Sequence, residues 1–198
     1  MKAQKKQRVC LNLGSGSNLI TGQGWINVDN FAIPSESKEF NFVKGDVRDL
    51  PFEKGYADYI LLDNVLEHLP QSEIPDVLYE IKRVLKVGGQ ALIVVPDFTC
   101  IAEEWMNYAK INHYDFPTHK FFSEIIFGNQ IHEGEYHKSA FYPAYMGAML
   151  HMVGLHNFEL IGAPKGMLIK DLKEFEGMQI SEHGAFRNSM IIAKITKE

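Results

Sequence analysis

The chain has 198 residues, of which 45% are hydrophobic and 23% are charged, so the composition is that of a folded globular protein and excludes disordered and fibrous classes. Its length fits a single domain over residues 1–198. There are 20 Lys and Arg against 25 Asp and Glu, which gives a formal net charge of -5. This acidic balance argues against a protein that holds nucleic acid by neutralising its phosphates.

The two cysteines, Cys10 and Cys100, are too few for a disulfide framework and favour a reducing compartment. The basic start of the chain is followed by a short apolar run, Val9 to Leu13, which is well below the roughly 7 to 15 residues of a signal peptide's apolar region. No stretch approaches the ~18 consecutive apolar residues of a membrane span. We therefore expect a cytoplasmic protein without a membrane partner.

Short β-type runs alternate with turn or helix signals in the first half, which is the pattern of an α/β domain with a mostly parallel sheet. The predicted strands are Val9 to Leu13, Trp25 to Asp29, Phe42 to Gly45, Asp58 to Leu62 and Gln90 to Val95. Apolar residues recur at spacings of three and four from Ile74 to Leu85, which predicts a helix. Ser72 is expected to cap its start, and Gly88-Gly89 to end it.

The second half begins with a different kind of segment. Beyond a predicted helix over Ala102 to Lys110 it has no clean period, and it holds His113, His119, His132 and His137. Long irregular excursions in compact domains usually cover a site, so residues 98–141 are expected to form an inserted, lid-like segment after the fifth strand. A helical face and two more strands follow, with the face made of Tyr142, Tyr145, Met149 and Val153 and the strands over Asn157 to Ile161 and Ser189 to Ile195.

Glycine and carboxylate side chains follow the predicted strands. Gly14 and Gly16 stand at the carboxyl end of the first strand, where the lack of a Cβ lets the backbone approach a ligand closely. Asp29 ends the second strand, at a position from which a carboxylate can accept hydrogen bonds from both hydroxyls of a ribose. Asp46 and Asp63 end the third and fourth strands. The same edge of the sheet therefore gathers a candidate nucleotide-type site.

Five sequence motifs follow one another along the chain: LNLGSGS, INVDN, KGDVRDLPF, DYILLDNVLEHLP and LKVGGQALIVVPD. In these motifs and in their order the sequence resembles the class I S-adenosylmethionine-dependent methyltransferases, particularly the small-molecule branch that includes quinone-biosynthesis-like enzymes. The five motifs cover about residues 9–97. HKSAFYPAYMGAMLHMVGLHNFEL is similar to the family's late helix, glycine and sixth strand. The resemblance implies a Rossmann-like, seven-stranded, mostly parallel sheet with an antiparallel last strand, and S-adenosylmethionine as the cofactor.

The resemblance also implies roles for single residues. The Gly14-Ser15-Gly16 turn would pass under the methionine and ribose portions of the cofactor, and Asp29 would hold the ribose hydroxyls. Asp46 would accept a hydrogen bond from the adenine amino group, and the backbone N–H of Val47 would donate to the ring. Asp63 and Asn64 would line the wall beside the sulfonium and the methionine amine.

Two departures from the family pattern affect this site. Asn12 stands where an acidic residue is usual. It can still accept a hydrogen bond and so remains a predicted cofactor ligand, but it supplies no charge to the cofactor's ammonium group, and we expect weaker affinity. Asn18 replaces the usual third glycine. The short spacing between Gly16 and Asp29 predicts that the first helix is very short or replaced by a loop.

Other chemistries fit less well. A nicotinamide-type site needs Gly-x-Gly-x-x-Gly at the start of a helix and an acid ~20 residues later, and a P-loop needs Gly-Lys-Ser/Thr. The chain has neither of these patterns. His132 and His137 in HEGEYH are five positions apart with Gly134 between them, so they would not share a helical face, and we expect no metal site there. The Pro-Pro-aromatic signature of DNA amino-methyltransferases is absent after the fourth strand.

Methyl transfer makes few demands on side chains, because the sulfonium already activates the methyl group and positioning of the acceptor contributes most. Where a general base is needed, the covering segment offers His137 first, then His132 and His119. His68, which follows Glu67 after the fourth strand, is a further candidate. Tyr136 and Tyr142 are candidates for shaping an acceptor pocket.

The sequence thus predicts a methyltransferase that acts on a small polar acceptor, such as a sugar or another metabolite, by in-line displacement. Two alternatives stay open. Asn12, Asn18 and the missing first helix would also suit a module that binds S-adenosylmethionine without turnover. An RNA or protein methyltransferase is the other alternative, although the acidic charge argues against nucleic acid.

Overall fold

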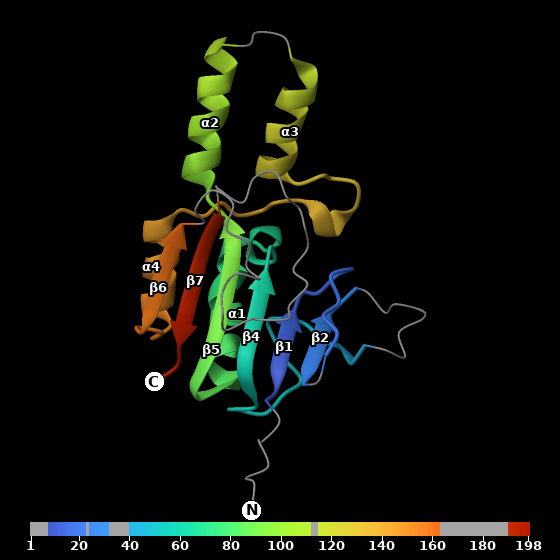
Figure 1. Ribbon diagram of the computed structural model, residues 1–198, viewed down its shortest axis with the longest axis vertical. Coiled ribbons are helices and arrows are strands. Elements are labelled where there is room, and N and C mark those ends of the chain that lie inside the picture. Colours follow the sequence, from blue (N-terminus) through green and yellow to red (C-terminus); the bar gives the residue numbers. More distant parts are fainter. Residues whose placement is uncertain (1–7, 23, 32–39, 112–114, 163–189) are drawn as a thin grey trace, which may run out of the picture.

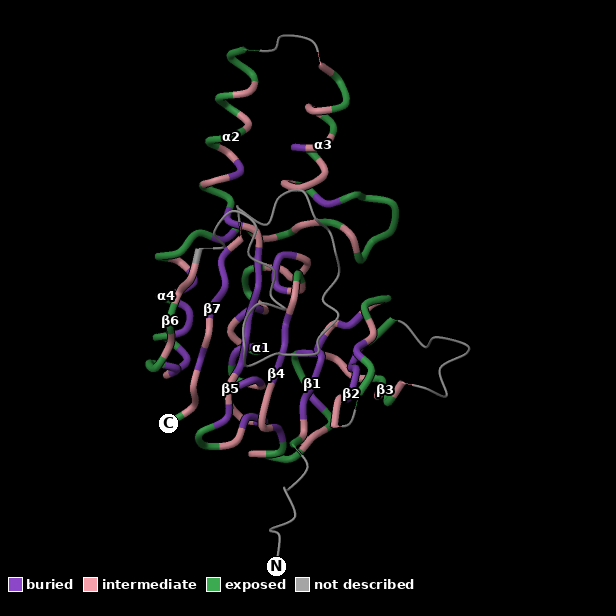
Figure 2. The backbone as a smooth tube through the Cα atoms, in the orientation of Figure 1, coloured by how far each residue is buried: buried purple, intermediate pink, exposed green. Residues whose placement is uncertain are grey.

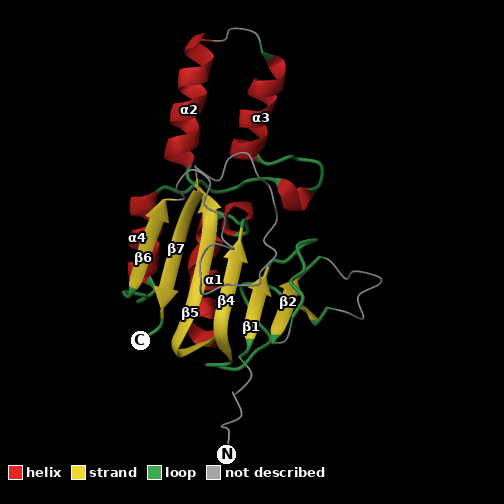
Figure 3. Cartoon of the chain, in the orientation of Figure 1, coloured by secondary structure: helices red, strands yellow, loops and turns green. Residues whose placement is uncertain are grey.

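The computed structural model describes residues 8–22, 24–31, 40–111, 115–162 and 190–198. The described residues form a seven-stranded sheet in the order β3-β2-β1-β4-β5-β7-β6 (Figures 1 and 3). Its strands are β1 (Cys10–Leu13), β2 (Trp25–Asp29), β3 (Phe42–Lys44), β4 (Ala57–Asp63), β5 (Leu85–Pro96), β6 (Phe158–Gly162) and β7 (Met190–Thr196). Strands β1 to β5 pair in parallel, whereas β7 is antiparallel to β5 and β6. The predicted Rossmann-like sheet with an antiparallel last strand is confirmed.

Helices α1 (Ile74–Val84) and α4 (Pro143–Met152) cover the face of the sheet that is turned away from the viewer in Figure 1. The predicted spacing of three and four in α1 places its apolar residues in the core, namely Ile74, Val77, Leu78, Ile81 and Val84. Alternate residues of the central strands serve the two faces: Leu62 and Ile93 join this core, while Leu61 and Leu92 join a smaller cluster on the opposite face. The central strands are therefore buried on both sides (Figure 2).

Both ends of α1 differ from the prediction. Its N-cap is Glu73 without a side-chain hydrogen bond, because Ser72 belongs to a preceding 3-10 turn, η2 (Gln71–Glu73), rather than capping the helix. Its C-terminal end comes before Gly88-Gly89, because Leu85 is already extended and pairs with Ala57 as the first residue of β5. The two glycines lie within β5 at a register irregularity, where Gly88 has a φ of 77°.

Helices α2 (Phe98–Ile111) and α3 (Phe116–Phe127) extend beyond the carboxyl ends of β4 and β5 (Figure 1). Asp97 starts α2 by accepting a hydrogen bond from the Thr99 backbone N–H at 3.0 Å. The covering segment was expected to be irregular after Lys110, and α3 corrects that expectation. The sequence of α3 is rich in apolar residues but has no clear polar face opposite an apolar one, so its period did not reveal a helix. In the structure it buries only Phe122, which stacks on Trp105 of α2 with ring centroids 6.4 Å apart.

Helix α4 follows the predicted face with one exception. Met149 and Val153 are buried and Tyr145 packs against the core, but Tyr142 is the N-cap and is 45% exposed. An N-cap residue precedes the first helical turn, so its side chain does not continue the buried face. None of the helices in the described parts of the chain is long and apolar enough to cross a membrane.

A loop replaces the first helix over the described residues between β1 and β2, 14–22 and 24. Asn27, in the middle of β2 and fully buried, anchors this loop. Its Oδ1 accepts from the Ile20 N–H at 2.8 Å and from Asn12 Nδ2 at 2.9 Å, and its Nδ2 donates to the Ile20 carbonyl at 3.0 Å. Asn12 Nδ2 also donates to the Asn18 carbonyl at 2.8 Å. The predicted loss of the first helix is confirmed there, and amide side chains take over its backbone hydrogen bonds.

Candidate functional site

A cavity of about 1350 Å³ opens at the carboxyl ends of the parallel strands. The loops after β1, β2, β3 and β4 form one wall, and the segment after α3 forms another. Ligands of open α/β sheets bind at this edge. Most of the residues predicted for the site line the cavity: Gly14, Ser15, Gly16, Asp29, Asp46, Val47, Asp63, Asn64, His68, His132 and His137.

The turn after β1 is held in a conformation that only glycine adopts easily. Gly14 and Gly16 have φ values of 63° and 48°. A Cβ on Gly14 would lie 2.5 Å from Cγ2 of Val65, whereas a Cβ on Gly16 would meet nothing within 4 Å. Gly14 therefore permits close packing within the protein, while the open side of Gly16 is available to a ligand.

Asp29 joins the second strand to this turn. Its Oδ2 accepts from the Gly16 N–H at 2.8 Å, and its Oδ1 accepts from the Phe31 N–H at 2.8 Å. Asp29 is 9% exposed and lines the cavity. Because two backbone donors fix its orientation, the side chain is preorganised at the tip of β2.

Asn12, predicted as a cofactor ligand, lies beneath the cavity wall. The side chain is 4% exposed, and its amide nitrogen is engaged by Asn18 and Asn27. It therefore shapes the turn that faces the cavity, and a direct contact of Asn12 with the cofactor stays a prediction. An acidic residue here could not donate these two hydrogen bonds, because an ionised carboxylate only accepts.

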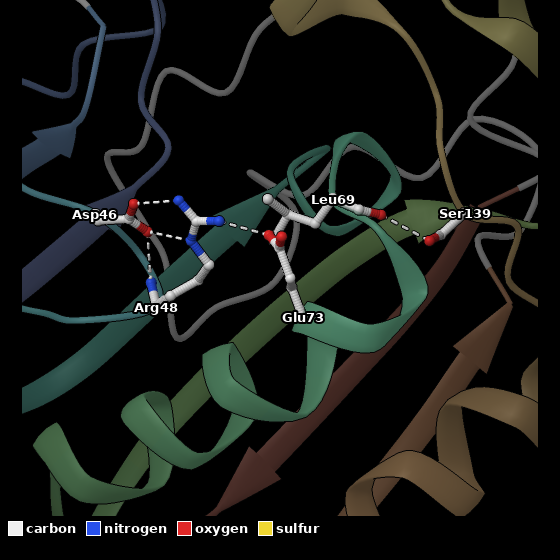
Figure 4. A network of polar contacts seen from close by, with 5 residues as sticks. All are labelled: Asp46, Arg48, Leu69, Glu73 and Ser139. Carbon is white, nitrogen blue, oxygen red and sulfur yellow. Dashed lines mark hydrogen bonds and ion pairs between the residues drawn. The ribbon is translucent and has the colours of Figure 1, made fainter.

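Asp46, predicted to meet adenine, is engaged by Arg48 (Figure 4). Arg48 donates from Nε to Oδ1 at 2.8 Å and from Nη2 to Oδ2 at 2.5 Å, and its Nη1 pairs with Glu73 at 2.5 Å. The hydrogen bonds from Arg48 hold the pKa of the Asp46 carboxyl below its usual value. An adenine amino group would share this carboxylate with a guanidinium, which the sequence motif did not reveal.

Asp63 and Asn64 form a polar tip at the end of β4. Asn64 has a φ of 54°, a left-handed conformation that Asn tolerates better than most residues. Its Nδ2 donates to Asp63 Oδ1 at 2.9 Å, and its backbone N–H donates to the Val94 carbonyl at 3.0 Å. The backbone bond to β5 fixes where both side chains enter the cavity.

The predicted histidines fall into different surroundings. His68 and His137 meet edge to face, with ring centroids 4.8 Å apart. His132 lies at the exposed rim, where its Nδ1 is 3.2 Å from Glu135. His119 packs between α2 and α3, with its Nδ1 3.4 Å from Trp105 Nε1. The pair in HEGEYH is therefore separated, and His137 turns instead toward a residue from another part of the chain.

Glu67 is a residue of this site that sequence reasoning did not select. It lies with His68 in the 3-10 turn η1 (Leu66–His68) and is 2% exposed. Burial raises the pKa of its carboxyl to about 8. Burial also lowers the pKa of His137 to about 4 and that of His68 below its usual value. At neutral pH the two imidazoles are uncharged and can accept a proton or a metal ion.

Backbone hydrogen bonds fix the segment that carries His137 against η1. The Glu67 carbonyl accepts from Lys138 N at 2.7 Å and from Ser139 N at 3.1 Å. Ser139 Oγ donates to the Leu69 carbonyl at 2.7 Å (Figure 4). The signal in the sequence was the Glu-His pair directly after the fourth strand, but its partner lies about 70 residues away in the chain.

Gly128 sets the course of the same segment at the end of α3. Its φ is 80°, and a Cβ there would lie 1.7 Å from the Glu135 carbonyl oxygen. The His137 N–H donates to the Phe127 carbonyl at 3.0 Å, which closes the turn. A side chain at position 128 would therefore displace the backbone that holds His137.

Part of the chain is similar to a known sequence family. Residues 25–93 match the family model described as "Methyltransferase domain". The chain is 32% identical over 83 residues to 2-methyl-6-phytyl-1,4-hydroquinone methyltransferase, chloroplastic, of Arabidopsis thaliana, which is 39% of this chain and 24% of that protein. It is 30% identical over 105 residues to the biotin biosynthesis bifunctional protein BioHC of Cellvibrio japonicus, which is 47% of this chain and 20% of that protein. The chain thus spans about a quarter of the curated relatives that it matches.

Solved structures share the fold. A SAM-dependent methyltransferase from Archaeoglobus fulgidus superposes with a TM-score of 0.59 at 16% identity, over 98% of this chain and 87% of that one. A possible histamine N-methyltransferase from Thermotoga maritima gives a TM-score of 0.57 at 14% identity, over 100% of this chain and 85% of that one. At these identities the likeness is one of fold.

Proposed function

We propose that this chain is a class I S-adenosylmethionine-dependent methyltransferase, which moves the methyl group of S-adenosylmethionine to a small polar acceptor that binds in the same cavity. The observation that carries the proposal is the preorganised Asp29 carboxylate beside the open Gly16 turn. A ribose needs a paired acceptor next to backbone that a ligand can approach closely, and both occur together there.

The residues around the cavity fit the cofactor. The Asp29 carboxylate would accept from the ribose hydroxyls, and the open side of Gly16 would lie against the methionine and ribose portions. Val47, with Asp46, would bracket the adenine, and the Asp63 and Asn64 pair would face the methionine amine. The cavity of about 1350 Å³ leaves room for a second small molecule beside the cofactor.

S-adenosylmethionine supplies a methyl group that its sulfonium has already made electrophilic. The protein must then hold the acceptor in line with the breaking carbon–sulfur bond, exclude water and accept the acceptor's proton. His68 and His137 are the groups proposed to accept that proton, because both are uncharged at neutral pH and line the cavity. The rim position of His132 suits contact with the acceptor more than proton transfer.

The acceptor class is part of the proposal. A hydroxyl-bearing molecule fits a wall with imidazoles, and the hydroquinone in the name of the Arabidopsis relative is one such compound to test. Neither a binding module without turnover nor an RNA or protein methyltransferase is favoured by the comparisons.

Calorimetry with S-adenosylhomocysteine tests the cofactor half. We expect one binding site, and Asp29→Ala should weaken binding at least about tenfold, since a hydrogen bond to a charged group contributes roughly 1.5 to 3 kcal/mol. Asp76→Ala is the matched control, because Asp76 is an exposed acid on α1 and its loss changes the net charge equally. A wild-type protein that fails to bind the ligand at millimolar concentration, or equal affinity in the two variants, would refute the assignment.

A further inference from the structure

Three metal-ligating side chains from two distant segments meet at one end of the cavity. Glu67 and His68 come from η1, and His137 comes from the stretch between η3 (Glu133–Glu135) and α4. One donor atom from each lies within 4.8 Å of the others. Within the described parts of the chain this is the group of three that could hold a metal ion.

Two atoms of this cluster are buried without a hydrogen-bond partner, namely Glu67 Oε2 and His68 Nδ1. Leaving a buried polar group unsatisfied costs about 1 to 3 kcal/mol, so native structures rarely keep two side by side. Both orphaned atoms belong to residues that line the cavity. A ligand that accepts electron pairs from both would explain why they are retained.

The backbone places the two imidazoles beside each other. The rings of His68 and His137 meet edge to face, with centroids 4.8 Å apart. The segment that carries His137 is held against η1 by hydrogen bonds from the Lys138 and Ser139 N–H groups to the Glu67 carbonyl. The two rings and the Glu67 carboxyl are therefore brought together by the fold, as the ligands of a metal site must be.

We propose that Glu67, His68 and His137 bind a divalent first-row transition-metal ion whose open coordination positions face the cavity. Two imidazoles and one carboxylate are the ligand set of catalytic zinc sites, which keep a further position for water or substrate. Imidazole nitrogen selects Zn²⁺ or Fe²⁺ over Mg²⁺ or Ca²⁺, which prefer oxygen ligands. Ligand distances of about 2.0 to 2.2 Å require the three side chains to close in by roughly an ångström.

The two histidines of HEGEYH, His132 and His137, have different partners in the structure. His132 and His137 do not share an ion, because His132 pairs with Glu135 at the rim. His137 joins Glu67 and His68 instead, so only the fold brings the ligand set together. The Glu-His pair alone offers two ligands and could not complete the site.

The metal site deepens the proposed function and rests on it for its role. An ion at this position lowers the pKa of an acceptor hydroxyl that coordinates it. With the ion bound, His68 and His137 serve as ligands and no longer as proton acceptors, so the hydroxyl gives its proton to solvent. Its oxygen forms a bond to the methyl carbon, and the carbon–sulfur bond breaks with its electron pair left on sulfur. The inferred substrate class is therefore an acceptor with a hydroxyl group that can reach the ion.

The test is metal binding by the full chain. Protein freed of metal with a chelator is titrated with Zn²⁺ by calorimetry, and with Co²⁺, whose visible absorption reports its coordination. We expect one ion per chain, with binding weakened at least about tenfold in His137→Ala and in Glu67→Gln, and much weaker binding of Mg²⁺. The matched control is the His151→Ala and His156→Ala double variant, since that exposed pair, with Nδ1 atoms 2.9 Å apart, is the competing imidazole site.

Circular dichroism and binding of S-adenosylhomocysteine without metal accompany each variant. These readouts report folding and the cofactor site separately, so loss of cofactor binding would count against the proposed function and not against the metal site. The metal site is overturned if the folded protein binds no stoichiometric Zn²⁺ or Co²⁺ below about 100 μM. It is also overturned if only the double variant, and neither His137→Ala nor Glu67→Gln, loses the ion.

Discussion

Asn27→Ala tests whether a polar network has taken the place of the first helix. Four hydrogen bonds of the Asn27 side chain would be lost, two that link it to Ile20, one from Asn12 and one to the Asn41 carbonyl at 3.3 Å. At about 1 kcal/mol each the loss is about 4 kcal/mol. The Ile20 N–H would also be left buried without its acceptor. For a chain of this size the melting temperature should fall by roughly 10 °C.

Urea unfolding followed by circular dichroism measures this loss, with Asn157→Ala as the control because Asn157 is exposed. The control should stay within about 0.5 kcal/mol of wild type. Asn12→Ala should cost about 2 kcal/mol, for the bonds to Asn18 and Asn27, and the double variant less than the sum because one bond is shared. A loss below about 1 kcal/mol in Asn27→Ala would refute the anchoring role.

Three further predictions concern other parts of the framework. Glu80→Gln should cost about 1 to 2 kcal/mol of unfolding free energy at pH 7, because the Glu80 carboxylate accepts hydrogen bonds from Arg83 and from the Leu50 N–H. The hydrogen bond from Arg83 lowers the pKa of Glu80 in the folded state, so this stabilisation is present above pH ~4.5 and is lost as the pH falls through the folded-state pKa. Urea unfolding from pH 7 to pH 3 should therefore show a smaller loss of stability with acid in the variant than in the wild type. Gly14→Ala should destabilise the fold by about 1 to 3 kcal/mol because of its contact with Val65, whereas Gly16→Ala should cost only about 1 kcal/mol and mainly weaken S-adenosylhomocysteine binding, as thermal unfolding and calorimetry will show. Gly128→Ala should destabilise the fold clearly more than Gly134→Ala, where a Cβ meets nothing within 4 Å, and equal melting temperatures would contradict the close approach at position 128.

The sheet was predictable because its physical causes are local. Strands buried on both faces produce continuous apolar runs, and β2 was predicted with the bounds that the structure has. The face of α1 followed from its spacing. Its ends did not, because the pairing of Leu85 with Ala57, a contact between distant residues, ends the helix before its glycines are reached.

The site was predictable only where each residue follows its own strand. The carboxyl ends of parallel strands meet at one edge, so strand order alone brings Asp29, Asp46 and Asp63 to the cavity. Their roles toward the cofactor stay predictions. The salt bridge of Arg48 could not be predicted, because it depends on side-chain rotamers. The role of Glu67 could not be predicted either, because it depends on the burial of its carboxyl and on the approach of His137.

The two walls of the cavity have different origins in the chain. The wall with Asp29 comes from loops within residues 25–93, which the family model matches, and from the turn after β1, which precedes that match. The wall with His137 comes from the segment after β5, which that match does not cover. Glu67 and His68 lie within the matched residues, whereas His137 lies outside them. Since methyltransferases share a cofactor and differ in acceptor, we expect the acceptor to be recognised where the second wall meets the first, at the cluster of Glu67, His68 and His137.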